Sequence, residues 1–388
     1  MKTFTKTLLA IITLLLNFNL NAAVITVSNW SVIPAQFTSV QDAIVAANAN
    51  DTIYVHGSPT SYGTIYILKK LTIIGAGFYT SGQNQNKSKF NAVYLQPKEV
   101  AGIDNSALIG IQSDYIYYQY YADPSGQVFY NVREITIDRC YFANLSSGYS
   151  SSTTNNSFVI KNCFINGPIN LIGVTDISIA NNYFIGSGSI EGASSPALNA
   201  IIFQNAFIGG FYPGNLVNPS CLSYYGITTS GNTLGTLNNV IFTNNIFYGV
   251  PLNPSLTNTV FNNNIAFATN NDALVFPGAI TTGTISSNPN FVQMENPQIA
   301  ACQFYNSIHA SLSEAYFNQI NLTLAASSPA INTGIGGVNI GPSGGVSEFN
   351  YRTQSRPRIP QMQSLIINNA GIPLGGTLNV QIQGQKQD

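Results

Sequence analysis

Charged side chains are scarce in this chain of 388 residues. Asp, Glu, Lys and Arg together make up 7% of the sequence, and the formal net charge is −1. Electrostatic capture of nucleic acid or of an anionic membrane depends on clustered Lys and Arg, so neither is expected as a partner. Histidine occurs only at His56 and His309, which we interpret as loop or strand-edge residues rather than catalytic ones.

Long hydrophobic runs are missing after the N-terminus. A membrane-spanning helix needs about 20 consecutive apolar residues, so no transmembrane segment is expected in the mature chain. At the N-terminus, Lys2 and Lys6 flank the start of the apolar run Leu8 to Leu16, and Asn21-Ala22-Ala23 fits a small-residue cleavage site. We predict a signal peptide over residues 1–23 and an exported protein that is secreted, at the cell surface or associated with the outer membrane.

Cysteine is also rare, with four residues in the chain. Cys140 and Cys163 occupy the same position in consecutive repeats, where stacked parallel strands lie about 4.8 Å apart. This separation permits a disulfide but the direction of the side chains is unfavourable, so we predict two buried thiols. Cys221 and Cys302 have no assigned partner.

What the sequence does contain is a six-residue phrase that recurs through its middle. The phrase begins at residues 137, 160, 179, 203, 242 and 261, at intervals of 23, 19, 24, 39 and 19 residues. Short strands in units of about 20–25 residues, without helical stretches between them, predict a stack of coils.

Within each unit, alternate side chains face opposite sides of the strand. The third position of the phrase is expected to turn the chain in the left-handed conformation, which Asn tolerates: Arg139, Asn162, Asn181, Asn205, Asn244 and Asn263. The next position points inward: Cys140, Cys163, Asn182, Ala206, Asn245 and Asn264. Buried Asn side chains need partners, so we predict that stacked amides form a hydrogen-bonded ladder.

The N-terminal third fits the same scheme. Residues 37–50 carry an apolar pattern of modest helical length, and three short strands are expected at 51–55, 65–67 and 71–75. A helix placed here would cap the open end of the stack and protect its strand edges.

Residues 40–75 resemble the entry coil of right-handed parallel β-helix proteins of the pectin-lyase-like class, in which a helix with an "AI..A" pattern precedes "DTIYV" and "LTIIG". Three later phrases look like a secreted subgroup from Gram-negative bacteria. Residues 288–292 resemble "NPLFV", residues 328–334 resemble "SPAIDAG" and residues 339–345 resemble "DIGAYGG". Asn332 and Asn339 stand where that subgroup has acids. The resemblance covers most of residues 37–345 and implies a fold that hosts lyases, hydrolases, adhesins and inert scaffolds.

We therefore predict an all-β protein, a single-stranded right-handed parallel β-helix (solenoid) over residues 24–350 with an N-terminal amphipathic helix cap. Residues 351–388 contain Arg352, Arg356 and Arg358, followed by two strand-like runs at 363–369 and 376–384. These runs are interpreted as a C-terminal β-hairpin cap that closes the end of the solenoid, or as an attachment or sorting segment.

Residue types for catalysis are sparse. The resemblance implies that pectate lyases pair an Arg or Lys base with Ca²⁺-binding carboxylates, whereas polygalacturonases use several Asp, and neither set can be placed on this chain. If a polar site exists, it is expected within residues 98–139, from these side chains: Asp104, Asp114, Asp123, Arg133, Asp138 and Arg139. The alternative is that they are solvated loop charges. No catalytic residue, metal ligand or cofactor is assigned, and Ca²⁺ remains without support.

Two aromatic features indicate binding. An outward apolar stripe follows the ladder position: Tyr141, Phe164, Tyr183, Phe207, Ile246 and Ile265. It is either covered by inserted chain around residues 209–237 or exposed to a partner or glycan, and a register shift of one residue would make it core. The second feature is a tyrosine cluster, which is either a contact surface or a half-buried strand: Tyr115, Tyr117, Tyr118, Tyr120 and Tyr121.

The leading hypothesis is an exported, non-catalytic surface protein that binds a polysaccharide or an envelope protein through aromatic residues. A polysaccharide lyase or glycoside hydrolase, and a structural subunit of an outer-surface assembly that docks by the stripe, are the alternatives.

Overall fold

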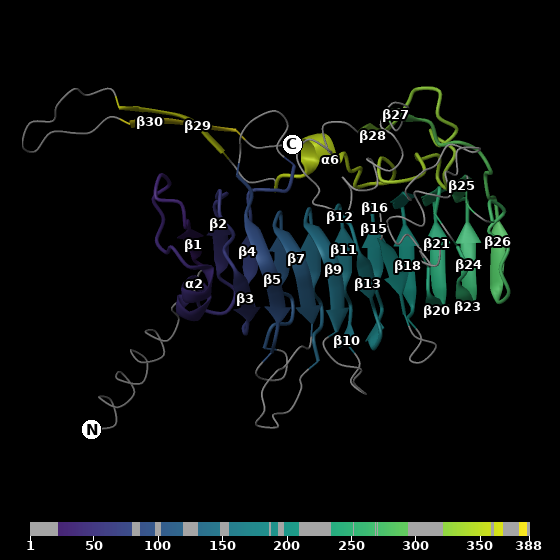
Figure 1. The fold of residues 1–388 in the computed structure, drawn as a ribbon. Coiled ribbons are helices and arrows are strands. Elements are labelled where there is room, and N and C mark those ends of the chain that lie inside the picture. Colours follow the sequence, from purple (N-terminus) through teal and green to yellow (C-terminus); the bar gives the residue numbers. More distant parts are fainter. Residues whose placement is uncertain are drawn as a thin grey trace, which may run out of the picture.

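The computed structural model describes residues 22–79, 86–97, 102–118, 131–147, 155–185, 188–192, 198–208, 234–250, 252–267, 269, 271–293, 321–357, 361–367 and 380–385. The predicted signal sequence and the chain at 209–233 therefore lie outside the described residues, as do Cys221 and Cys302. Figure 1 shows short strands stacked side by side along the molecule, with α2 near one end.

Two long parallel sheets of eleven strands each dominate the fold. Sheet 1 contains, in spatial order, β1 (Val24–Val27), β2 (Thr52–Val55), β4 (Thr72–Ile74), β6 (Ala107–Ile109), β8 (Thr136–Asp138), β11 (Val159–Lys161), β15 (Ser178–Ala180), β18 (Ala200–Phe203), β21 (Val240–Thr243), β24 (Thr259–Asn262) and β26 (Ala279–Thr282). Sheet 2 contains β3 (Thr64–Ile67), β5 (Lys89–Leu95), β7 (Gln112–Tyr118), β9 (Tyr141–Ser147), β12 (Phe164–Ile165), β13 (Pro168–Asn170), β16 (Tyr183–Ile185), β17 (Ser189–Glu191), β19 (Ala206–Ile208), β22 (Ile246–Tyr248) and β25 (Ile265–Phe267). This arrangement is consistent with the predicted parallel β-helix.

Four smaller two-stranded sheets complete the described strands. Two are parallel and pair β10 (Asn155–Asn156) with β14 (Val174–Thr175), and β20 (Thr236–Asn238) with β23 (Ser255–Thr257). Two are antiparallel and pair β27 (Phe291–Gln293) with β28 (Asn321–Leu324), and β29 (Gln361–Ile367) with β30 (Val380–Gln385).

Each unit turns where a residue adopts a left-handed backbone, and these corners repeat at a fixed spacing. In eight successive units, two residues with positive φ lie five positions apart and bracket a strand of sheet 1: Asn105 and Gly110, Glu134 and Arg139, Ser157 and Asn162, Asp176 and Asn181, Asn199 and Gln204, Asn239 and Asn244, Asn258 and Asn263, Gly278 and Gly283. The predicted second corner is thus confirmed in most units, whereas the first corner was not foreseen. Asn and Gly dominate both columns because they tolerate positive φ at low cost.

One unit of the predicted repeat is out of register by one residue. Tyr183 lies opposite Ala206 and Phe184 opposite Phe207, so this repeat begins at Ile202 rather than Phe203. The corner is therefore Gln204, with φ of 57°, and not Asn205. The corner residue of this unit is Gln204 and the next residue is Asn205. Because the other corners are mostly Asn, the sequence pattern placed Asn205 at the corner.

The predicted asparagine ladder is present, and the register correction lengthens it. Its members are fully buried and belong to four consecutive units: Asn182, Asn205, Asn245 and Asn264. The Nδ2 of each of the first three donates to the Oδ1 of the next Asn at 3.0 Å, and the Oδ1 of all four accepts a backbone N–H from the preceding unit at 2.8–2.9 Å. Cys140 and Cys163 continue the same column as free, buried thiols, as predicted.

Helix α2 (Val40–Ala46) begins at Ser39, whose hydroxyl accepts the Asp42 amide at 3.2 Å. Its buried residues join the main core, and the Gln41 side chain hydrogen-bonds both Tyr66 N and Tyr66 O, on the outermost strand of sheet 2. The helix therefore hydrogen-bonds the backbone of Tyr66 at the edge of sheet 2, in agreement with the capping role expected of it.

Residues 321–357, which we call the strap, return along the stacked strands toward their N-terminal end (Figure 1). The strap contains α6 (Tyr351–Gln354), whose neighbour Ser355 donates its hydroxyl to Tyr79 O at 3.2 Å. The β29–β30 hairpin confirms the predicted pair of strands. However, Arg356 and Pro357 lie against Gly77 and Gly110, which follow β4 and β6. The chain thus leads to the hairpin near the N-terminal strands, and the expectation that the hairpin closes the end formed by β26 is wrong.

Candidate binding surface

The outward apolar stripe is covered, and the strap covers it. Tyr141, Phe164 and Tyr183 are buried, together with the other members of the column, in a second hydrophobic cluster with strap residues: Leu322, Ala330, Ile340, Phe349 and Tyr351. Tyr351 packs against the rings of both Phe164 and Tyr183, with centroid distances of 5.2 Å. The prediction of a covered stripe is confirmed, but the cover comes from the C-terminal chain; residues 209–233 lie outside the described residues.

Phe207 is a separate correction. The one-residue register shift places it in the inward column, where it stacks between Phe184 and Phe247 at centroid distances of 4.5 and 4.9 Å. Ala206 takes its place in the stripe. The four aromatic residues expected to bind a ligand from the stripe are all buried and therefore unavailable to one: Tyr141, Phe164, Tyr183 and Phe207.

Polar contacts hold the strap along the second corner column. Asn181 Nδ2 donates to Pro342 O and Gly344 O at 2.9 and 3.0 Å, and Asn244 Oδ1 accepts Ile335 N at 2.9 Å. These corner residues thus have two roles: their backbones turn the chain, and their side-chain amides hydrogen-bond the strap.

A row of tyrosines remains on the outward side of sheet 2. Tyr66, Tyr94 and Tyr117 lie in register on β3, β5 and β7, with ring centroids 4.9 and 5.0 Å apart and interplanar angles of 14° and 20°. Tyr115 stacks on Tyr117 within β7 at 5.7 Å. Tyr66 and Tyr115 are 41% and 46% exposed, and Tyr94 and Tyr117 are half-buried, so this row is accessible from solvent.

These near-parallel rings cover one another's faces in an offset stack. Their edges and hydroxyl tips are consequently the parts that are directed away from the sheet. In register with them, β9 and β13 continue the surface with uncharged polar side chains: Asn144, Ser146 and Asn170. We call the row and this continuation the tyrosine surface.

For Tyr115 to Tyr118, the structure shows the second of the two interpretations of the tyrosine cluster, a half-buried strand, and a role in binding stays a prediction. Tyr115 and Tyr117 belong to the surface, whereas Tyr118 is fully buried and donates its hydroxyl to Asn170 O at 2.6 Å. Tyr120 and Tyr121 lie outside the described residues. Tyr66 and Tyr94 were missed, although an aliphatic–Tyr–aliphatic pattern at 65–67 and 93–95 precedes the Ile116-Tyr117-Tyr118 segment and could have identified them.

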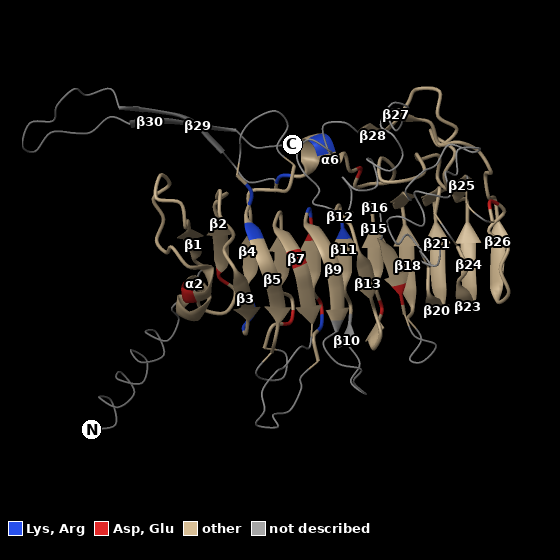
Figure 2. Ribbon diagram, in the orientation of Figure 1, with Lys and Arg blue, Asp and Glu red and all other residues tan. Residues whose placement is uncertain are grey.

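Among the residues that the structure describes, the predicted polar side chains do not all converge on one site. Asp104 forms an ion pair with Arg133 at 3.2 Å, and these two residues precede the sheet 1 strands β6 and β8. Asp138 is the last residue of β8 and therefore lies at the opposite end of that strand. Asp114 lies on β7 beside Tyr141, and its charge adds to the burial that raises the pKa of Tyr141 to about 12. Asp123 lies outside the described residues. Figure 2 shows how thinly charged residues are distributed over the described strands.

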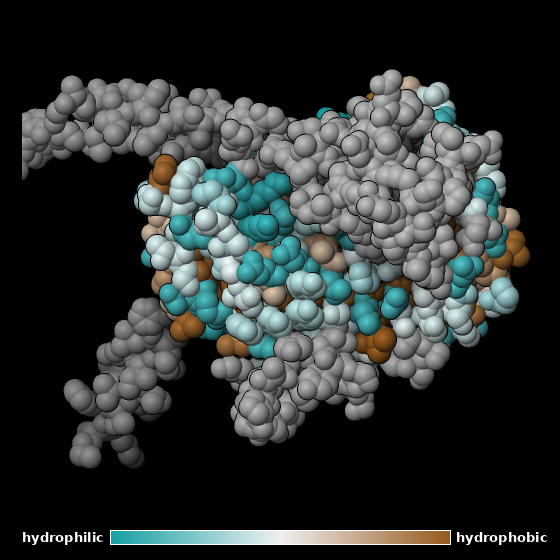
Figure 3. Space-filling view, viewed as in Figure 1, coloured by the Kyte–Doolittle hydropathy of each residue, from teal (hydrophilic) through white to brown (hydrophobic). Residues whose placement is uncertain are grey.

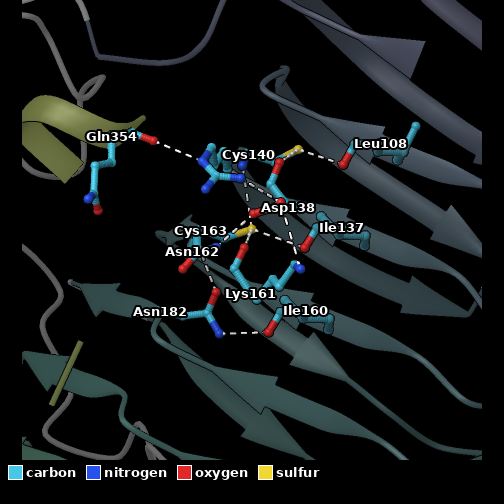
Figure 4. A network of polar contacts seen from close by, with 11 residues as sticks. Leu108, Ile137, Asp138, Cys140, Ile160, Lys161, Asn162, Cys163, Asn182 and Gln354 are labelled. Carbon is cyan, nitrogen blue, oxygen red and sulfur yellow. Dashed lines mark hydrogen bonds and ion pairs between the residues drawn. The ribbon is translucent and has the colours of Figure 1, made fainter. Parts of the chain in front are cut away.

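Asp138 is the centre of a small charged network beneath the strap (Figure 4). Its carboxylate contacts Arg139 Nη1 at 2.7 Å, Lys161 Nζ at 4.0 Å and Asn162 Nδ2 at 2.9 Å. Arg139 Nε donates to Gln354 O at 3.1 Å, so the network ties α6 to the corner of the sheets. This arrangement pairs every charge with a structural partner, which favours a role in holding the strap over one in catalysis.

No group of three or more His, Cys, Asp or Glu side chains that could hold a metal occurs within the described ranges. In the same part of the chain, no helix has the length and apolar character needed to cross a membrane.

A second exposed surface lies on sheet 1. Ile201, Ile241 and Ile280 are 52%, 42% and 65% exposed and, with Val260, form a row in register across four strands. The described part of the face in Figure 3 is mainly hydrophilic with separate hydrophobic patches, one of them at the β26 end.

Neither a scan against protein-family models nor a search of the curated proteins finds a match for this chain. The resemblance to the pectin-lyase-like class consequently stays a prediction. The two long parallel sheets are consistent with it.

Proposed function

We propose that this chain is an exported, non-catalytic protein with a right-handed parallel β-helix fold that binds a polysaccharide or an envelope protein through the tyrosine surface. The observation that carries this proposal is the in-register stack of Tyr66, Tyr94 and Tyr117, on which Tyr115 also stacks, with Tyr66 and Tyr115 exposed. Tyrosine combines a rigid apolar ring with a polar tip, and it loses little conformational entropy when it binds.

The fold proposal rests on the alternation of the chain between the two sheets and on corners that recur five residues apart. Export is proposed from the N-terminal sequence pattern, with cleavage near residue 23. The lyase or hydrolase alternative receives no support from the separated pairs Asp104–Arg133 and Asp138–Arg139.

The test uses the mature chain, residues 24–388, against intact envelope material and against a glycan array. The Tyr66→Ala/Tyr115→Ala double variant is compared with Val275→Ala, which truncates an exposed apolar side chain between β25 and β26. We expect the tyrosine variant to lose most binding while Val275→Ala retains it, with unchanged circular dichroism for both. Equal binding by all three proteins would refute the proposed surface, and release of unsaturated sugar products would favour a lyase.

A structural subunit is a second candidate, favoured by the exposed row of Ile201, Ile241, Val260 and Ile280 rather than by the covered stripe. An apolar row on a sheet face is a typical site for self-association. Analytical ultracentrifugation of the wild type and of Ile241→Lys tests it. A concentration-dependent assembly that the lysine abolishes would support this function, and a monomer at all concentrations would exclude it.

A further inference from the structure

The direction of the tyrosine surface restricts what can bind to it. The row crosses β3, β5 and β7, so that equivalent side chains repeat at 4.9 and 5.0 Å across the strands rather than along them. A ligand that contacts the whole row must therefore be extended and lie across the strands.

A peptide strand added to the sheet is not compatible with this site. Strands β5 and β7 each pair with a neighbour on both sides, so their backbone groups already serve the sheet. On the outermost strand, Tyr66 N and O are both hydrogen-bonded to Gln41 of α2. The edge groups that strand addition would need beside Tyr66 are thus already hydrogen-bonded, and a ligand that spans the row is bound by side chains.

The chemistry of these side chains is polar but almost uncharged. Two columns cross sheet 2 in register from β3 to β17, the first with Tyr66, Tyr94, Tyr117, Ser146, Asn170 and Glu191, and the second with Thr64, Ala92, Tyr115, Asn144, Pro168 and Ser189. Among these described positions, Glu191 alone carries a formal charge, and it stands at the end far from the tyrosines. A surface without clustered charge gives a polyanion or polycation no electrostatic advantage.

We propose that the ligand is an uncharged, hydroxyl-rich polysaccharide that lies across β3, β5, β7 and β9. Phenol, hydroxyl and amide groups along the two columns match the hydroxyls of such a chain, and the ring edges match its apolar C–H groups. This inference rests on the proposed binding function and specifies its ligand class.

The surface is a row on a sheet face, so each sugar makes few contacts and affinity accumulates over several sugars. Affinity for oligosaccharides should rise with chain length until the ligand spans the tyrosine row and should then level off. Because the contacts are uncharged, affinity should change less than twofold between low and high salt.

Affinity electrophoresis of the mature protein in gels that contain a neutral β-glucan, a neutral α-glucan, a neutral mannan or a uronic-acid polymer tests the proposal. We expect at least one neutral polymer to retard the wild type. Tyr66→Ala/Tyr115→Ala should weaken that binding at least tenfold, and Tyr66→Phe/Tyr117→Phe, which removes only hydroxyls, about threefold. Val275→Ala, which truncates an exposed apolar side chain outside both candidate surfaces, serves as the matched control and should bind like the wild type.

The outcomes separate this inference from the proposed function. Retardation by the uronic-acid polymer alone, or binding only to an envelope protein, with loss in the tyrosine variants, would overturn the neutral polysaccharide and leave the tyrosine surface intact as a binding site. Retardation by a neutral polymer that is unchanged in both tyrosine variants would overturn both. Absence of retardation by every neutral polymer would overturn the inference about the ligand.

Discussion

Removal of one rung of the asparagine ladder provides the sharpest test of how this fold is held together. Asn245 Nδ2 donates to Ile202 O at 2.9 Å and to Asn264 Oδ1 at 3.0 Å, and its Oδ1 accepts the backbone N–H of Asn205 at 2.9 Å. Asn245 is fully buried, so Asn245→Ala removes these contacts from a site without access to bulk water.

The expected loss follows from the groups left behind. The Asn205 N–H loses its acceptor in a buried site, which costs about 1–3 kcal/mol, and each of the two Nδ2 hydrogen bonds contributes about 1 kcal/mol. Asn245→Ala should therefore lower the free energy of unfolding by about 3–5 kcal/mol. Asn91→Ala is the matched control, because this exposed side chain accepts only the Ser61 hydroxyl among the described residues, and its loss should cost about 0.5 kcal/mol or less.

Urea unfolding followed by circular dichroism measures both variants. The slope of the transition must be compared between them, since a stack of repeats can lose its all-or-none unfolding when one unit is weakened. If Asn245→Ala and Asn91→Ala shift the midpoint equally, the ladder does not contribute in the way its geometry indicates.

The ladder also predicts a substitution in the opposite direction. Cys163 occupies the next rung, its backbone N–H already donates to Asn182 Oδ1 at 2.8 Å, and its sulfur lies 3.0 Å from Lys161 O. Cys163→Asn should supply an amide to that carbonyl and an acceptor to Cys140 N, and should raise the free energy of unfolding by about 1 kcal/mol. A loss of 2 kcal/mol or more in the same urea experiment would show that the site cannot accommodate the larger side chain.

Three further predictions concern the strap, the turns and the buried stripe. Tyr351→Ala removes a fully buried ring from the cover of the stripe, so the free energy of unfolding should fall by about 3–5 kcal/mol and limited proteolysis should cut the strap first; equal cleavage of wild type and variant would contradict this. At Gly167 a Cβ atom would lie 1.7 Å from Ala143 O, so Gly167→Ala should prevent folding, whereas Gly63→Ala, with φ of 75° and no atom within 4 Å of the new Cβ, should cost about 1 kcal/mol; similar soluble yields would refute the difference. Burial raises the pKa of Tyr141 from 10.0 to about 12, so the unfolded chain releases this proton first and stability falls as pH rises from about 10 to 12; Tyr141→Phe should lose less stability over that interval, as measured by urea midpoints, and an unchanged pH profile would exclude the effect.

The repeat and its inward and outward alternation were predictable because both follow from local chemistry. Asn at corners and at ladder positions leaves a signature in the sequence, since few other residues adopt positive φ or form stacked amides. The error at Gln204 shows the limit of this signature: two adjacent amides in one unit allow two alignments, and only pairing with the neighbouring strands decides between them.

The candidate site was less predictable. The stripe of Tyr141, Phe164 and Tyr183 and the row of Tyr66, Tyr94 and Tyr117 have the same outward aromatic pattern, yet the stripe is buried and the row is partly exposed. The difference depends on where residues 321–357 lie. Their position is a tertiary property, determined by contacts between parts of the chain that are up to 276 residues apart.

That separation has a consequence for the order in which the protein folds. Parallel strands can be added one unit at a time as the chain emerges, because each new strand pairs with the one before it. The strap cannot, because Ser355 reaches Tyr79 and Gln354 reaches Arg139 only after nearly the whole chain is available, across 276 and 215 residues. Until that last step, a growing chain carries the bare aromatic stripe, so the strap, residues 321–357, decides whether the nascent molecule aggregates or folds fully.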